Sequence, residues 1–165
     1  MVLRIAGVIE ESVVDGPGLR FVVFVQGCYH HCPGCQNEDT WDPAGGYAVA
    51  AAELLNQIKS VRLIKGVTFS GGEPFLQPAP LAWLGRRVKK LGLDVVTFTG
   101  YTWEELLSLA PENRAVKELL EVSDYLVDGP FILSERDLSL PFRGSRNQRI
   151  IDLRKGRVMG DGWLK

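Results

Sequence analysis

The sequence has 165 residues, of which 45% are hydrophobic and 24% charged, and 19 basic against 20 acidic side chains give a net charge of −1. A chain of this length and composition is expected to fold as a single domain over residues 1–165. Because no basic excess exists to attract phosphates, we expect no general binding to nucleic acid. The apolar runs are too short to cross a bilayer, and the first residues lack a signal-peptide core. We therefore expect no membrane association and a cytoplasmic location.

Short β-like runs alternate with helical stretches along the first half of the chain. A strand buried on both faces is predicted at 19–25, and a cysteine-rich loop follows it. An alanine-rich helix is predicted at 48–60, with leucine and isoleucine on one side. A second strand is predicted at 66–70, before a helix that opens at Pro78 or Pro80.

The same alternation continues in the second half. A third strand is predicted at 94–99. Thr102 is a candidate N-cap, and Glu105 three residues later would complete a capping box. Pro111 is expected to end that helix, and a further helix should run to about Val122. The last predicted strands are 125–127 and a short one around 150–151.

This order of elements predicts an α/β fold with mainly parallel strands joined by right-handed crossovers. Four or five such units cannot close an eightfold barrel, so we expect an open, partial (β/α) barrel. Ligands in such sheets bind at the carboxyl ends of the strands. The predicted strand ends all carry glycine and should meet at one rim: 26–27, 70–72, 99–100 and 128–129.

The three cysteines of the chain, Cys28, Cys32 and Cys35, lie in one loop with C-x3-C-x2-C spacing. An odd number of thiols crowded into one loop is a poor disulfide framework and favours a metal site. Thiolates are the usual ligands of iron–sulfur clusters, and three of them would leave one iron of a cubane open.

Structural zinc is the strongest alternative at this loop. His30 and His31 are the two histidines of the chain, and either one could supply a fourth ligand beside three cysteines. Three buried free thiols are a weaker alternative at this spacing. The loop alone leaves iron and zinc open, although the histidines are more typical of loop residues than of ligands.

A second motif, Ser70-Gly71-Gly72-Glu73-Pro74, follows the second predicted strand. On its own it is a plausible strand-to-helix turn. After a cysteine triplet it resembles the GGE motif of the radical S-adenosylmethionine superfamily, in which three cysteines hold a [4Fe–4S] cluster and the open iron chelates S-adenosylmethionine. The resemblance implies this cluster and this cofactor here, and a partial barrel of the radical-SAM type.

Further motifs narrow the resemblance to the activating enzymes of anaerobic ribonucleoside-triphosphate reductases. They cover the chain from about Val8 to Ile151 and comprise 15–20 (DGPGLR), 27–28, 32–35, Asn37, 40–41, 99–101, 126–129 and 143–148 (RGSRNQ). The resemblance implies reductive cleavage of S-adenosylmethionine to a 5′-deoxyadenosyl radical. That radical would generate a glycyl radical on the large reductase subunit, with a small flavoprotein or ferredoxin as electron donor. A small-molecule substrate, or another glycyl-radical protein of the formate-lyase type, is the alternative.

The resemblance also assigns roles to residues. Cys28, Cys32 and Cys35 would be the catalytic cluster ligands. The other assigned positions would contact cofactor: Gly34 and Gln36 near the adenine and cluster, Gly71, Gly72 and Glu73 near the methionine end, and Thr99 and Asp128 at ribose or carboxylate.

Two positions depart from the pattern of related enzymes. Many related enzymes carry an aromatic residue at the position of Gly34, and some carry a basic residue at the position of Pro130. If that base holds the methionine carboxylate, Arg143 or Arg146 would have to replace it here. Asp15 is as readily explained as a turn residue as by a function.

Overall fold

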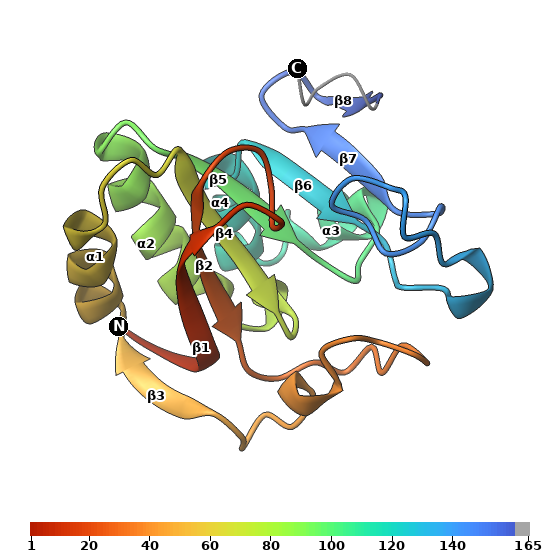
Figure 1. Ribbon diagram of the computed structural model, residues 1–165, viewed down its shortest axis with the longest axis horizontal. Helices are drawn as coiled ribbons and strands as arrows, with labels where there is room; N and C mark the ends of the chain where they lie inside the picture. The colour runs from red at the N-terminus through yellow and green to blue at the C-terminus, as the bar shows by residue number, and fades with distance from the viewer. Residues whose placement is uncertain (161–165) are drawn as a thin grey trace.

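The computed structural model describes residues 1–160, which form one eight-stranded sheet in the order β3-β1-β2-β4-β5-β6-β7-β8 (Figure 1). The strands are β1 (Val2–Ser12), β2 (Arg20–Val25), β3 (Tyr47–Ala50), β4 (Gly66–Gly71), β5 (Asp94–Phe98), β6 (Tyr125–Asp128), β7 (Arg149–Asp152) and β8 (Arg157–Met159). The helices are α1 (Ala51–Ser60), α2 (Pro78–Lys90), α3 (Trp103–Leu109) and α4 (Arg114–Val122), with short 3₁₀ turns at Glu38–Thr40, Pro74–Leu76 and Leu133–Glu135.

The four central strands are parallel, as predicted. β2 pairs with β4, β4 with β5, and β5 with β6, all in parallel register. The sheet is extended on both sides by antiparallel strands: β1 and β3 beyond β2, and β7 and β8 beyond β6. Since β3 and β8 do not pair with each other, the barrel is open, and the predicted α/β partial barrel is confirmed.

Two local predictions have different outcomes. The capping box is present, because the Thr102 hydroxyl accepts from the Glu105 amide while the Glu105 carboxylate accepts from the Thr102 amide. The predicted helix start at residue 48 is wrong. Residues 47–50 pair with β1 as a strand, and the helix begins at Ala51. Strand pairing with a distant segment thus overrides the helical preference of alanine.

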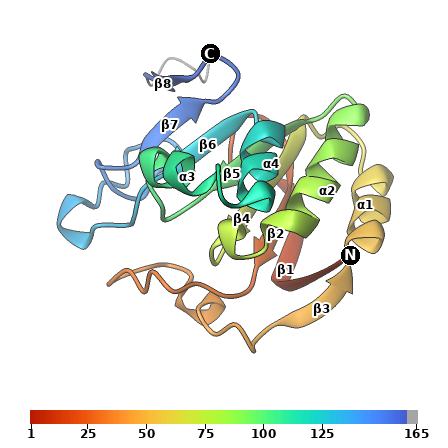
Figure 2. The same cartoon turned by 180° about the vertical axis from the view of Figure 1, so that it is seen from behind.

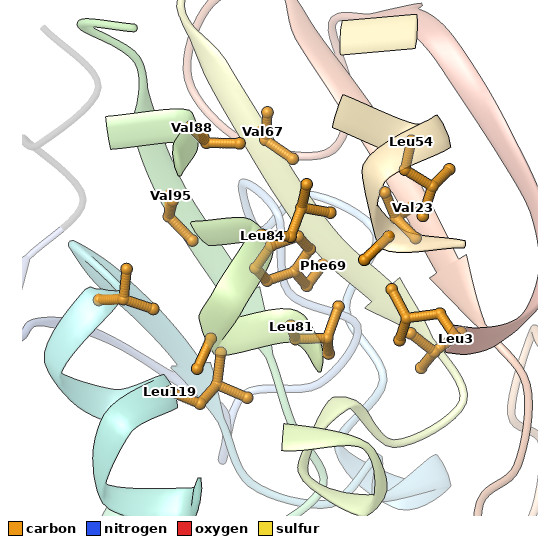
Figure 3. Packing of buried hydrophobic residues seen from close by; sticks show 14 of the residues in the cluster. Leu3, Val23, Leu54, Val67, Phe69, Leu81, Leu84, Val88, Val95 and Leu119 are labelled. Carbon is orange, nitrogen blue, oxygen red and sulfur yellow. The ribbon is translucent and has the colours of Figure 1, made fainter. Parts of the chain in front are cut away.

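The helices cover one face of the sheet, as the two opposite views show (Figures 1 and 2). Alternate residues of the central strands face them and form the main core, which Figure 3 shows from close by with Val23, Val67, Phe69 and Val95 on the strands and Leu84 on α2. Burial of a side chain of this size contributes about 1.5–3 kcal/mol, so this layer provides most of the driving force for folding.

On the opposite face of the sheet, the connection between β1 and β2 passes over β4 (Figure 1). A buried arginine, Arg20, anchors this connection. Its guanidinium donates to the carbonyl oxygens of Pro17 and Val67, to the Thr68 hydroxyl and to the Asp94 carboxylate. The Thr68 hydroxyl in turn donates to the carbonyl of Asp15. The DGPGLR motif therefore closes the interior near the amino ends of the parallel strands.

Within residues 1–160, none of the helices has the combination of length and hydrophobicity that crossing a bilayer requires.

Candidate functional site

A cavity of about 450 Å³ lies at the carboxyl ends of the parallel strands, where the glycine-bearing strand ends were predicted to meet. Ser70, Gly71 and Gly72 after β4, Thr99 and Gly100 after β5, and Gly129 after β6 line it. All three cysteines line the same cavity, together with Gln36, Asn37, Thr40 and Trp41. The two motifs separated in the sequence therefore meet at one site.

The cysteine loop leaves β2 and is fastened where it begins and ends. The amides of Gly27 and Cys28 donate to the carbonyls of Thr40 and Trp41 at 2.7 and 3.0 Å. The side chain of Gln26 donates to the carbonyls of Asp39 and Asp42, so this buried amide binds the returning segment. These bonds hold the two ends of the loop, residues 28–41, next to each other.

The three thiols differ in exposure. Cys28 is buried at the end of β2, and burial raises the pKa of its thiol. Cys32 and Cys35 are half-buried and are joined by a tight turn, in which the Cys35 amide donates to the Cys32 carbonyl at 3.1 Å. None of the three forms a disulfide. Across residues 1–160, no three His, Cys, Asp or Glu side chains are already gathered around a single point, so the thiols border the cavity as separate groups.

Both histidines of the loop contact residues other than the cysteines. His30 Nε2 lies 2.9 Å from Glu73 Oε2, and this hydrogen bond raises the pKa of His30. The ring of His31 is stacked on Trp41 with the ring centroids 4.5 Å apart.

Glu73 is the most heavily bonded group of the cavity wall. Its carboxylate is 1% exposed and accepts from the Phe75 amide, the Thr99 hydroxyl at 2.6 Å and the Gly100 amide at 2.8 Å, in addition to its contact with His30. Removing an isolated carboxylate from water costs several kcal/mol, and only such a set of donors can offset that cost. Glu73 therefore joins the ends of β4 and β5 to the cysteine loop.

The paired glycines of the GGE motif are required by the approach of two backbones. The Gly72 amide donates to the Val25 carbonyl, and the Glu73 amide donates to the Gly27 carbonyl, both at 2.8 Å. Gly71 has a φ of +93°, in the region that favours glycine, and any Cβ there would clash with Val25. The turn after β4 is thereby pressed against the start of the cysteine loop.

The remaining predicted site residues lie in different surroundings. Gln36 lines the cavity. Gly34 faces the 131–133 segment instead, and a Cβ there would lie 2.9 Å from Leu133 Cδ1. Asp128 is also outside the lining. Its buried carboxylate accepts from the Trp103 amide and from the amide and guanidinium of Arg149.

Several lining residues had not been predicted. Phe98 of β5, and Phe131, Leu138 and Phe142 of the segment after β6, add an apolar wall to the cavity. The segment carries no periodicity that would have indicated this wall. His30 had been considered only as an alternative zinc ligand, and Trp41 only as part of a motif.

A partial barrel with a three-cysteine loop after its first parallel strand and a GGE turn after the second defines an iron–sulfur protein of the radical-SAM class. The iron–sulfur part of this definition is supported by a comparison, since the family described as "4Fe-4S single cluster domain" matches residues 14–151.

Three relatives indicate which family within this class the chain belongs to. The anaerobic ribonucleoside-triphosphate reductase-activating protein of Escherichia coli K12 is 35% identical over 152 residues, which are 87% of this chain and 94% of the relative. The protein of that name from Vibrio cholerae is 36% identical over 148 residues, 84% of this chain and 91% of the relative. A pyruvate formate-lyase-activating enzyme of Clostridium pasteurianum is 42% identical over 113 residues, 63% of this chain and 48% of the relative. The chain belongs to the family of anaerobic ribonucleoside-triphosphate reductase-activating proteins. The predicted resemblance is confirmed.

Proposed function

We propose that this chain generates a glycyl radical on the large subunit of an anaerobic ribonucleoside-triphosphate reductase, using a [4Fe–4S] cluster and S-adenosylmethionine. The observation that carries the proposal is the meeting of Cys28, Cys32 and Cys35 with the Gly71–Glu73 turn around one cavity. Membership of the family, with coverage of nine-tenths of the named relatives, supports the assignment of the activity to this chain.

The residues of the cavity fit such a cluster. Three thiols from one loop are its preferred protein ligands. We assign Cys28, Cys32 and Cys35 as the ligands.

We assign the turn after β4 to the methionine end of S-adenosylmethionine. Gly71 and Gly72 keep this turn free of side chains, and Glu73 fixes it through four donors. Thr99 acts on the cofactor through Glu73, to which its hydroxyl donates. Gln36, and more distantly Gly34, lie on the side of the cysteine loop and are assigned to the adenine. Asp128 contributes by ordering α3 and β7 at the rim.

When bound, the cluster and S-adenosylmethionine supply a radical able to remove hydrogen from a glycine Cα. The chain's own residues position the reactants and limit access of water. Arg20 holds the β1–β2 connection over the sheet, so the cavity is closed on that side. The apolar wall from Phe98, Phe131 and Phe142 borders the space where a glycine segment of the reductase subunit would enter.

An external electron donor is part of the proposal. Cys32 and Cys35 are half-buried, so a small flavoprotein or ferredoxin could approach the cluster from the side of the loop. Three free thiols also agree with a reducing, cytoplasmic compartment.

The experiment is metal analysis of the protein prepared without oxygen, followed by mixing with the large reductase subunit. We expect about four irons per chain and visible absorbance that changes on addition of S-adenosylmethionine. With reductant and the reductase subunit, electron paramagnetic resonance should show a glycyl doublet. Stoichiometric zinc with no uptake of iron on reconstitution would overturn the proposal in favour of a structural zinc site.

A glycyl-radical protein of the formate-lyase type is the second candidate partner, because the Clostridium pasteurianum relative is 42% identical over its matched region. Parallel incubation with a pyruvate formate-lyase separates the two. A doublet on the reductase alone supports the first partner, and a doublet on the lyase alone supports the second.

A further inference from the structure

His30 lies between the first two cysteines of the loop, yet its side chain is held by residues outside that loop. Its Nε2 is 2.9 Å from the Glu73 carboxylate, 43 residues away in the sequence. The edge of its ring packs against Tyr101, with ring centroids 4.6 Å apart and planes at 80°. The His30 side chain is 21% exposed, whereas that of Glu73 is 1% exposed, so the contact reaches from the loop into the buried end of the sheet.

Residues at the end of β5 determine where the His30 ring lies. A Cβ on Gly100 would lie 2.5 Å from Cδ2 and 2.8 Å from Cγ of His30, so any other residue at position 100 would displace the imidazole. The Thr99 hydroxyl and the Gly100 amide fix the two oxygens of the Glu73 carboxylate. The strand end of β5 thus supplies both the space for His30 and the orientation of its partner.

We propose that His30 is a positioning residue that couples the cysteine loop to the GGE turn, an inference that rests on the function proposed above. His30 is two residues after Cys28, and Glu73 is two residues after Gly71. One side-chain hydrogen bond therefore connects the part of the loop between the first two cysteines with the segment assigned to the methionine end of S-adenosylmethionine. It adds to the backbone bond between Glu73 and Gly27 and fixes this part of the loop relative to the turn.

The effect of losing the His30–Glu73 hydrogen bond depends on the contacts that still hold the loop and the turn. All three cysteines stay in a loop that is still fastened by Gln26, Gly27 and Cys28 through residues 39–42, so iron should still bind. The GGE turn keeps its backbone bonds to Val25 and Gly27 but loses its side-chain link to the cysteine-bearing part of the loop, so S-adenosylmethionine should bind more weakly. Loss of a partner that orients a ligand-bearing segment typically costs about 10–100-fold in affinity or activity.

The test uses His30→Ala, His30→Gln and the matched control His31→Asn, each reconstituted without oxygen. Gln can present an amide N–H close to the position of Nε2. His31 has a φ of +48°, which Asn tolerates, and it does not line the cavity. The measurements are iron per chain, the dissociation constant of S-adenosylmethionine by equilibrium dialysis, and the change in the paramagnetic resonance signal of the reduced cluster on adding S-adenosylmethionine.

We expect His30→Ala to keep wild-type iron content, to bind S-adenosylmethionine at least about tenfold more weakly, and to show a reduced spectral change. His30→Gln should recover part of both, and His31→Asn should match the wild type. The loss in the double variant His30→Ala/Glu73→Gln should be smaller than the sum of the two single losses, because both remove one contact.

Two results would overturn the coupling. One is unchanged binding of S-adenosylmethionine in His30→Ala, and the other is equal loss in His30→Ala and His31→Asn. Loss of iron together with S-adenosylmethionine binding in His30→Ala alone would also overturn it, since it would make His30 a requirement for the cluster itself. Failure of the proposed function is distinct, because the wild-type protein would then lack iron or show no response to S-adenosylmethionine.

Discussion

Gly72 and Gly27 meet backbone to backbone: a Cβ at position 72 would lie 2.9 Å from the carbonyl carbon of Gly27 and closer still to its oxygen. Because the Glu73 amide donates to that same oxygen, the turn after β4 and the residue that precedes the cysteine loop form one rigid unit. The glycine of the GGE motif is therefore needed for contact between two protein segments, whether or not a ligand is bound.

Gly72→Ala tests this contact. The added methyl group must push the ends of β2 and β4 apart, so we expect a loss of about 1–3 kcal/mol in the free energy of unfolding and a fall in iron content. The matched control is Gly7→Ala, since a Cβ at Gly7 meets nothing within 4 Å. Denaturation curves and iron analysis of the two variants provide the comparison. Equal behaviour of both would show that the strand ends can separate without cost.

Single replacements of Cys28, Cys32 or Cys35 by alanine should each abolish cleavage of S-adenosylmethionine. Each of these thiols lines the cavity, and the chain has no fourth cysteine to replace a lost one. Formation of 5′-deoxyadenosine under reducing conditions is the measurement, with His31→Asn as the loop control. Cleavage that persisted in any cysteine variant would refute that residue as a ligand.

Arg20→Met should be among the most destabilising single changes. It leaves the Asp94 carboxylate and the carbonyls of Pro17 and Val67 without their donor, and breaking a buried pair in this way costs about 3–5 kcal/mol. Arg20→Lys should recover little, because one ammonium cannot serve acceptors arranged around a planar guanidinium. Urea denaturation measures the loss.

The comparison for Arg20 is Arg114→Ala. Arg114 is 90% exposed and pairs with Glu118 one helical turn away, so its removal should cost no more than about 0.5 kcal/mol. Similar losses for the two arginines would contradict the anchoring role of Arg20.

Replacement of Arg149 should raise the pKa of the Glu104 carboxyl. The hydrogen bond from Arg149 lowers the pKa of the Glu104 carboxyl, so its contribution to stability is present above the ordinary glutamate pKa of about 4.3 and is lost as the pH falls through the lower folded value. Titration of the side-chain carboxyl carbon by nuclear magnetic resonance should give a value below the ordinary one. In Arg149→Met the value should return toward 4.3. A value unchanged by that substitution would assign the lowering to another group.

The local signals in the sequence predicted the central architecture well. Four buried strands, the helices between them and the capping box at Thr102 all depend on nearby residues, and each is found. The strand β1 was missed although it is 11 residues long, because much of it is exposed and its ladder depends on two distant partners, β2 and β3. The short strand β3 was missed for the same reason.

The site shows a similar division. The cysteine loop, the GGE turn and the convergence of strand ends could be predicted from motifs and from the geometry of parallel sheets. The contact of His30 with Glu73 could not, because it depends on a pairing across 43 residues and on the space left by Gly100. The burial of Arg20 likewise depends on Asp94, 74 residues away.

In the protein without its cluster, the unequal burial of the three thiols sets the order in which air would oxidise them. Cys28 is 9% exposed and its raised pKa keeps it in the less reactive thiol form. Cys32 and Cys35 are more accessible and sit at the two ends of one tight turn, so oxidants reach both before the third. Oxidation of the cluster-free protein should therefore begin at Cys32 and Cys35, while the sulfur of Cys28 at the end of β2 is still reduced.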